Sequence, residues 1–119
     1  MLHRDASLQS SRRNPVAGGM AAFGGRVRVT LRYVPDAKTL APARFIAYLQ
    51  TLESFDWASH ENLATTILQD VSNELVPRWV QIITHQEAGA DGSPEHKVLV
   101  EDRQPQWNNA ALLTSQETL

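Results

Sequence analysis

The strict alternation of apolar and polar residues over residues 26–33 constrains the fold of this chain more than any other feature. Val27, Val29, Leu31 and Tyr33 fall on one face, and an arginine or threonine occupies each position between them. A period of two, with β-branched and aromatic members, is typical of a strand that buries one face. Such a strand must lie in a sheet whose buried face is covered by another layer.

Two segments with helical periodicity follow and can supply that layer. In the first, Pro42 suits the opening turn of a helix, and apolar residues follow it at helical spacing. In the second, Ser59 is a good N-cap, apolar residues repeat every four positions, and Pro77 ends the helix. The two apolar stripes comprise Phe45, Tyr48, Leu49, Leu52 and Phe55 in the first segment and Leu63, Ile67, Val71 and Leu75 in the second.

Two more strands are predicted after the helices. Residues 79–85 are rich in Val, Ile and Thr, residues 97–101 alternate around two valines, and residues 88–94 have the composition of a hairpin loop. The order strand, helix, helix, strand, strand predicts an α+β domain with two helices packed on one face of an antiparallel sheet. So small a sheet leaves edges that invite pairing with another chain, so we expect a homo-oligomer.

The chain is expected to form one domain, because 119 residues can build one hydrophobic core but not two. Residues 1–24 are rich in Ser, Arg, Gly and Ala without a sustained period, which predicts a flexible N-terminal arm. Residues 25–103 are predicted to form the domain. Residues 104–119 are largely polar and are predicted to form an irregular C-terminal tail.

Composition excludes several kinds of chemistry. The chain has no cysteine, which removes disulfides, thiolate metal sites and a cysteine nucleophile together. No apolar run is long enough to span a bilayer, so no membrane partner is expected. Arg12 and Arg13 weakly resemble a twin-arginine leader, but glycines interrupt the stretch that follows them, and we expect a cytoplasmic protein.

Charge is distributed unevenly along the chain, although the formal net charge is only −2. Residues 1–50 contain eight Lys or Arg against two acids, and residues 51–119 contain three against eleven. This asymmetry fits either two oppositely charged solvated surfaces or a subunit whose basic side meets the acidic side of its neighbour. Because no basic cluster with interleaved aromatic residues is present, we expect no nucleic-acid partner.

Three short motifs connect this pattern to a known family. Residues 32–36, Arg-Tyr-Val-Pro-Asp, close the alternating strand, and residues 59–62, Ser-His-Glu-Asn, open the second helix. Residues 68–70 and 75–79 mark the end of that helix and the next strand. Together these motifs resemble the 7-cyano-7-deazaguanine (preQ0) reductases of queuosine biosynthesis, over about residues 26–86. The resemblance implies the tunnelling fold (T-fold), in which the sheets of several subunits join into an oligomeric barrel.

The sequence departs from that family where the family performs its chemistry. The nucleophilic cysteine of the family lies at the end of an earlier strand, and the nearest similar pair here is Asn14-Pro15. The NADPH signature Glu-Ser-Lys-Ser-Leu-Lys-Leu-Tyr corresponds to residues 41–48, of which only the final aromatic, Tyr48, remains. Without the thiolate and the two lysines we expect neither nitrile reduction nor a bound cofactor, and the catalytic residues, if any, are unknown.

Glu61 is the leading candidate for a ligand-binding residue. The resemblance implies that a glutamate at this place accepts two hydrogen bonds from the edge of a purine or pterin, and the two oxygens of a carboxylate suit two parallel N–H donors. Alternatively, Glu61 only complements the helix dipole in the first turn. Its neighbour His60 could orient the ligand or transfer protons, or it could simply be a polar first-turn residue.

No metal site is predicted, because the four histidines fall at no ligand spacing. His85 and His96 lie on facing sides of one predicted hairpin and could meet, although scattered histidines are more often surface residues. The other two are His3 and His60.

Aromatic and basic residues offer further contacts with a ligand. A tryptophan can stack on a base, and an arginine can meet a phosphate. A tryptophan inside an apolar strand is more often a core residue, and arginines along one strand face more often meet solvent or another subunit. The residues concerned are Trp57, Trp79 (inside an apolar strand) and Trp107, with Arg26, Arg28 and Arg32.

Two hypotheses of different classes follow. The first is a T-fold oligomer that binds a purine-, deazapurine- or pterin-type heterocycle at a subunit interface through Glu61 and His60, without nitrile reductase activity. The alternative is a structural or interaction module that keeps the fold and the oligomer but binds no small molecule. Ligand binding that depends on Glu61 distinguishes them.

Overall fold

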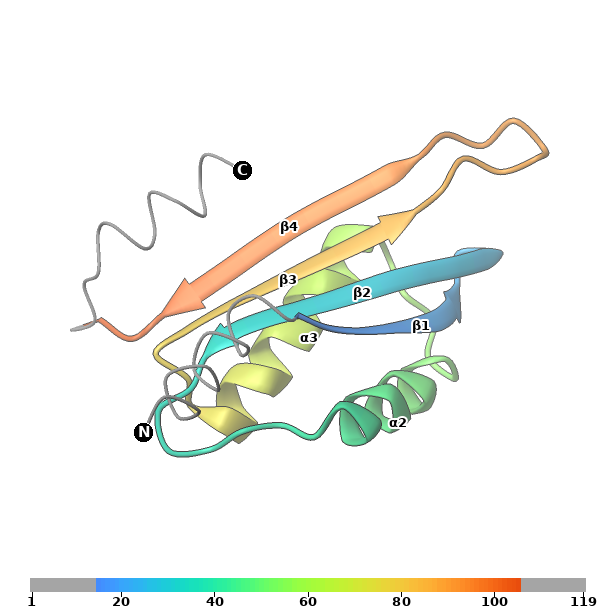
Figure 1. Ribbon diagram of the computed structural model, residues 1–119. Helices are drawn as coiled ribbons and strands as arrows, with labels where there is room; N and C mark the ends of the chain where they lie inside the picture. The colour runs from blue at the N-terminus through green and yellow to red at the C-terminus, as the bar shows by residue number, and fades with distance from the viewer. Residues whose placement is uncertain (1–14, 106–119) are drawn as a thin grey trace.

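The sheet has four strands, each antiparallel to its neighbours, in the order β1-β2-β3-β4. The computed structural model describes residues 15–105, and within this range both helices cover the same face of the sheet (Figure 1). The fold is therefore α+β, as the sequence predicts. The elements are β1 (Val16–Ala22), β2 (Gly25–Val34), α2 (Pro42–Leu52), α3 (His60–Leu75), β3 (Trp79–Gln86) and β4 (His96–Arg103).

One face of β2 forms the centre of the hydrophobic core, which confirms the predicted alternation. Val27, Val29 and Leu31 are fully buried, and Tyr33 is almost so. Leu31 lies opposite Ile82 of β3, so apolar side chains of adjacent strands share this face. The side chains between them belong to the opposite face of the sheet, because successive residues of a strand point to opposite sides.

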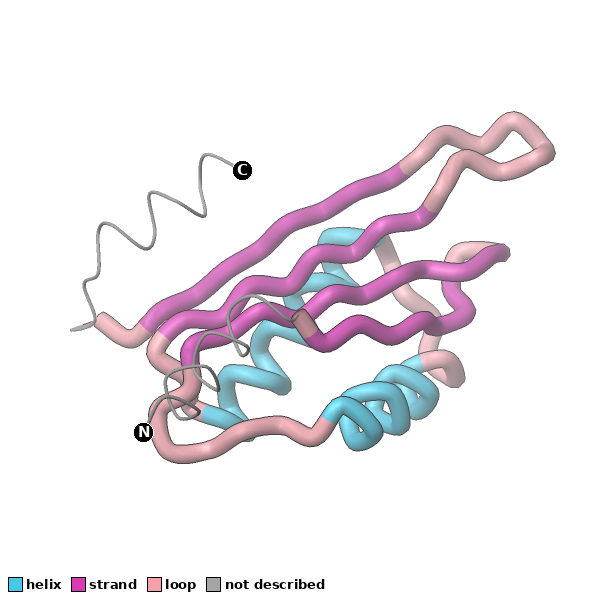
Figure 2. Tube along the Cα trace, viewed as in Figure 1, coloured by secondary structure: helices cyan, strands magenta, loops and turns pink. Residues whose placement is uncertain are grey.

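The first helix, α2, begins as predicted and ends earlier than its apolar stripe suggests. Pro42 occupies the first turn, and Phe45, Leu49 and Leu52 are buried. Phe55 falls beyond the end of the helix and is 60% exposed, so it is not a core residue. In the tube view of Figure 2, α2 lies beside β1, whereas α3 packs on the same face of the sheet against β3 and β4.

The second helix, α3, has a cap at each end. Ser59 is the N-cap, and its hydroxyl accepts a hydrogen bond from the backbone N–H of Asn62. At the other end Val76 adopts a left-handed conformation with φ of 44°, and Pro77 then prevents continuation of the helix. The buried stripe of the helix consists of Leu63, Ala64, Ile67, Val71 and Leu75.

Residues 16–22 form an edge strand, which corrects the prediction of a flexible arm over residues 1–24. β1 pairs with β2 along its whole length, from Val16 opposite Leu31 to Ala22 opposite Gly25. The sheet consequently has four strands instead of the three expected from periodicity.

The small residues of β1 explain both why the sequence did not predict this strand and how the strand packs. A Cβ atom on Gly18 would lie 2.8 Å from Cδ1 of Leu49, so α2 approaches this strand as closely as a glycine permits. Glycine and alanine have weak strand propensity, and here pairing and helix packing override it. The rest of the predicted arm, residues 1–14, and nearly all of the predicted tail, residues 106–119, lie outside the described residues.

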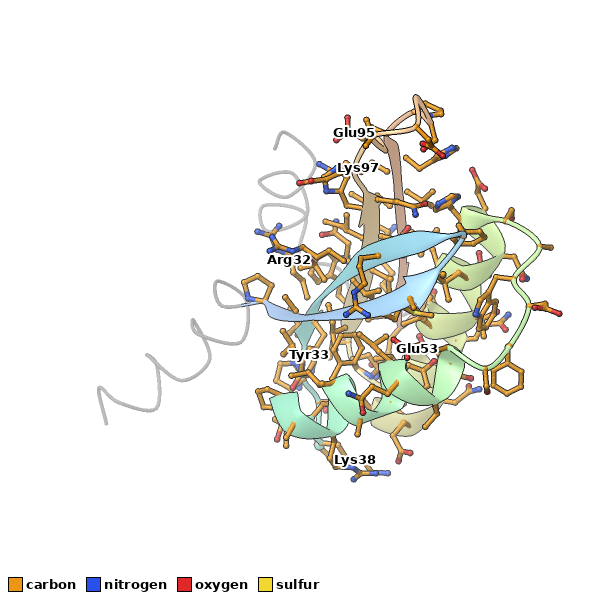
Figure 3. The ribbon with its side chains drawn as sticks, turned by 90° about the vertical axis from the view of Figure 1, so that its right-hand side faces the viewer. Arg32, Tyr33, Lys38, Glu53, Glu95 and Lys97 are labelled. Atoms are coloured by element: carbon orange, nitrogen blue, oxygen red, sulfur yellow. The ribbon has the colours of Figure 1, made fainter. Side chains whose placement is uncertain are left out.

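The face of the sheet away from the helices carries most of its positive charge. Arg26, Arg28 and Arg32 alternate with the buried residues of β2, and Lys97 occupies the same face on β4. Figure 3 shows Arg32 and Lys97 on the side opposite the helices, whereas Tyr33 lies between the sheet and the helices. No helix within residues 15–105 is long and apolar enough to cross a membrane.

Candidate functional site

The first turn of α3 holds both ligand-binding candidates, His60 and Glu61. The hydrogen bond from the Asn62 N–H to the Ser59 hydroxyl, 3.0 Å long, fixes the start of this helix. Glu61 is exposed, and no hydrogen bond or ion pair joins it to another residue of the described range 15–105. Its carboxylate is therefore accessible from solvent, at the end of the helix whose dipole favours negative charge.

The imidazole of His60 lies between two other rings. One face stacks on Phe23, from the turn between β1 and β2, with ring centroids 3.9 Å apart and an interplanar angle of 23°. His60 also stacks on His96, the first residue of β4, with centroids 4.2 Å apart and an angle of 5°. The three rings connect the β1–β2 turn, the start of α3 and the start of β4 at one corner of the fold. His60 is thus held in one orientation by contacts within the chain.

A hydrogen bond from β3 completes this arrangement. Nε2 of His60 lies 2.7 Å from Oε1 of Gln86, the last residue of β3. The amide nitrogen of Gln86 donates to the carbonyl of Ala22 at 3.4 Å, which agrees with the oxygen of Gln86 facing His60. Nε2 of His60 then carries the hydrogen, and its Nδ1 is left for another contact. The predicted ligand-binding role of His60 stays a prediction.

Phe23 is held in an unfavourable backbone conformation. Phe23 and Gly24 form the two-residue loop between paired Ala22 and Gly25, and both have positive φ, of 55° and 75°. Turns of this kind favour Asn or Gly at the first position, because a bulky side chain in the left-handed region costs roughly 1–2 kcal/mol. The stacking of Phe23 on His60 is the observed contact that offsets this strain.

A carboxylate from α2 covers part of the free edge of β1. Oε2 of Glu53, the C-cap residue of α2, accepts a hydrogen bond from the backbone N–H of Ala21 at 2.8 Å. The guanidinium of Arg26 lies 3.5 Å from the same oxygen. Figure 3 shows Glu53 between the end of α2 and the strands. Since an occupied N–H cannot pair with another strand, Glu53 closes this part of the edge.

Tyr48, the one residue that remains of the family's cofactor signature, has a structural partner. Its hydroxyl donates to Oδ2 of Asp70 at 2.6 Å and so ties α2 to α3. Burial raises the pKa of Tyr48 far above its usual range, and the hydrogen bond to Asp70 and the negative charge of Asp70 raise it further. The phenol therefore stays protonated in the folded protein. The packing of α2 against α3 accounts for Tyr48.

The histidines of the hairpin do not meet each other. His96 stacks on His60, on the helix side of the sheet, whereas Nε2 of His85 contacts Oε2 of Glu95. Their positions in the register of β3 and β4 place them on opposite faces of the sheet. Among residues 15–105, no group of three His, Cys, Asp or Glu side chains is placed to hold a metal ion.

The tryptophans of the described range have structural roles. Trp79 is 2% exposed, as expected of a core residue, but it alternates with Val80 and so belongs to the face opposite the helices. Its indole N–H donates to Oε2 of Glu101 at 3.2 Å. Trp57 is half-buried, and its N–H donates to the carbonyl of Leu52 at 2.9 Å. Trp107 lies outside the described residues.

Among the hollows of residues 15–105, two border the β1–β2 turn and another lies between the helices. An open cleft of about 700 Å³ separates the β1–β2 turn from the loop between α2 and α3, and Phe23 lines it together with Phe55 and Trp57. A smaller groove of about 410 Å³ lies between the helices, beside Tyr48 and Asp70. The cleft borders the ring stack at Phe23, and a larger hollow of about 1040 Å³, lined by Phe23, His85 and Gln86, borders it as well. Sequence reasoning did not find the cleft, since its walls come from segments about 30 residues apart in the chain.

Sheet, helices and their order define an α+β protein of the tunnelling fold. A solved structure with this architecture is the crystal structure of the archaeosine synthase QueF-Like in the apo form. It aligns with a TM-score of 0.60 and 20% sequence identity, covering 74% of this chain and 88% of that one. The similarity confirms the fold that the three motifs predict. No protein-family description and no curated protein matches the sequence.

Proposed function

We propose that this chain is a T-fold protein that binds a planar heterocycle of the purine, deazapurine or pterin type at a subunit interface. The observation that supports this most is the placement of Glu61. It is an exposed carboxylate without a partner among residues 15–105, in the capped first turn of α3, beside the immobilised ring of His60. Its two oxygens match the two adjacent N–H donors of a guanine or pterin edge.

The subunit interface is part of the proposal because a single sheet leaves both outer strands open. β4 has no neighbour on one side within residues 15–105, and β1 is covered by Glu53 only at Ala21. A homo-oligomer in which sheets join edge to edge would use these strands, in the way that barrels remove free edges. We expect the assembled protein to be cytoplasmic and to need no nucleic acid or membrane.

The proposed protein is not a nitrile reductase. The strand that precedes β2 is β1, and at its end stand Ala22 and Phe23 instead of a cysteine. Asn14-Pro15 precedes the start of β1 and is no substitute. Without a thiolate no thioimide can form with a nitrile, so incubation with 7-cyano-7-deazaguanine and NADPH should give no oxidation of NADPH and no adduct in the mass spectrum.

One observation favours the alternative, a structural or interaction module without a small ligand. The ring of His60 is already bonded to Gln86 and stacked on Phe23 and His96, so packing alone accounts for it. A thermal-shift screen with guanine, 7-deazaguanines and pterins separates the two functions. A ligand that binds only the folded state must raise the melting temperature, and a screen without any shift would favour the module.

A further inference from the structure

We propose that the cleft between the β1–β2 turn and the α2–α3 loop is a stacking site for a planar heterocycle with two adjacent N–H donors. The site lies within one subunit and involves residues that the resemblance to known reductases does not mark. It rests on the ligand class of the proposed function but not on Glu61, and the two can fail separately.

Aromatic rings line the cleft on two sides. On the side of the turn is Phe23, one face of which His60 already covers, so only its other face can meet a ligand. On the side of the loop is Phe55, which is 60% exposed and packs edge-to-face on Trp57 with centroids 6.1 Å apart. Base–aromatic stacking needs flat, solvent-accessible faces of this kind.

The β1–β2 turn leaves room for a ligand on its side of the cleft. A Cβ atom at Gly24 would meet nothing within 4 Å, so free space lies beside this residue. Phe23 remains in a strained conformation there although Asn or Gly would relieve it. Stacking on His60 accounts for a phenylalanine at this position, and the second face of its ring remains available to a ligand.

Charge selects the kind of heterocycle. Three charged residues line the cleft: Arg26, Glu53 and Asp56. Arg26 and Glu53 pair with each other, which leaves the exposed Asp56 without a hydrogen bond or ion pair in the described part of the chain. A free carboxylate beside an aromatic wall accepts two N–H donors, as guanine and pterins present, and adenine does not offer that pair.

The test uses three nucleosides that differ only at this edge. Guanosine has both donors, inosine lacks the amino group, and adenosine lacks the donor pair. Titration of ¹⁵N-labelled full-length protein with guanosine should shift the backbone signals of Gly24 and Gly25 and the indole signal of Trp57, all residues that line the cleft. Inosine should bind more weakly, and adenosine weakest.

Two variants remove the proposed contacts without touching the core. Phe55→Ala should weaken guanosine binding about tenfold, because stacking on an aromatic ring is worth that much or more. Asp56→Asn should also weaken it about tenfold and reduce the preference for guanosine over adenosine. Ile46→Ala, which removes an exposed aliphatic side chain of α2 outside the cleft, is the matched control and should bind guanosine as the parent does.

The affinities of these variants distinguish ligand binding in the cleft from ligand binding at Glu61. If Phe55→Ala and Asp56→Asn bind as the parent does while Glu61→Gln does not, the cleft proposal fails and the proposed function stands. If the cleft variants alone lose binding, the cleft stands and the role of Glu61 fails. Equal affinity for adenosine and guanosine would mean that the cleft does not recognise the pair of N–H donors, which overturns the proposal. Loss of the oligomer in Phe55→Ala, with no shift caused by nucleosides, makes the cleft an interface between copies and also overturns the proposal.

Discussion

The imidazole of His60 lies face to face with that of His96, with ring centroids 4.2 Å apart and planes within 5° of parallel. This contact joins the first turn of α3 to the first residue of β4, and Phe23 extends the stack to the β1–β2 turn. Residues 23, 60 and 96 are far apart in the sequence. The stack is therefore a tertiary constraint on the corner where Glu61 is exposed.

Replacement of Phe23 by Asn tests this constraint. Asn suits the left-handed turn, so relief of strain should offset much of the lost stacking and keep the free energy of unfolding within about 1 kcal/mol of the parent. The ring protons of His60 should shift downfield in the NMR spectrum, because the shielding by the phenyl ring is lost. Phe55→Ala is the control and should leave these signals in place; unchanged His60 signals in Phe23→Asn would contradict the stack.

Insertion of a larger side chain at Gly18 tests the position of β1. Gly18→Val should destabilise the fold by about 1–3 kcal/mol, because the new side chain overlaps the buried Leu49. Ala17→Val, one residue earlier and exposed on the other face, is the matched control and should be nearly neutral. Urea denaturation measures both. Equal stability of the two variants would mean that residues 16–22 do not pack on α2.

The raised pKa of Tyr48 predicts that the folded protein loses stability at alkaline pH. Its pKa is raised in the folded state, so the folded protein holds the phenolic proton more tightly than the unfolded chain does. The resulting stabilisation is complete below the ordinary pKa of tyrosine, 10.0, and is lost as the pH rises above it. Urea denaturation from pH 8 to 11 should show a steeper loss in the parent than in Tyr48→Phe. At neutral pH the variant should lose about 0.5–1.5 kcal/mol with its hydrogen bond to Asp70. Parallel pH profiles would refute the assignment.

The open edges and the uneven charge predict assembly. Light scattering at micromolar concentration should give a mass several times that of one 13.2 kDa chain, and raised salt should weaken contacts between the basic sheet face and acidic neighbours. A stable monomer at all salt concentrations would remove the subunit interface from the proposed function.

Local sequence patterns were sufficient to predict most of the fold. The alternation in β2, the proline at the start of α2 and the serine cap of α3 are all encoded within a few residues, so they can be recognised without tertiary information. β1 could not be recognised in this way. Its glycines and alanines have weak strand propensity, and the strand forms because β2 pairs with it and α2 packs on it.

The candidate site was predicted only in part, for a related reason. Glu61 and His60 are adjacent in one motif, but the contacts of His60 come from Phe23, Gln86 and His96 in separate segments. No local pattern links these residues, since each lies at a strand end that folding brings together. A phenylalanine before Gly24 was the one available signal, because a turn there requires a conformation that phenylalanine disfavours.

The central claim is that Glu61 binds the edge of a planar heterocycle, and Glu61→Gln tests it most directly. The substitution keeps the size of the side chain but replaces one acceptor oxygen by a donor. Isothermal titration with the ligand found by thermal shift should show an affinity loss of about thirty-fold or more, equivalent to about 2–3 kcal/mol. The melting temperature without ligand should hardly change, because a first-turn acid contributes only about 0.3–1 kcal/mol to the fold. Unchanged affinity for every ligand would contradict the claim and remove Glu61 from the binding site.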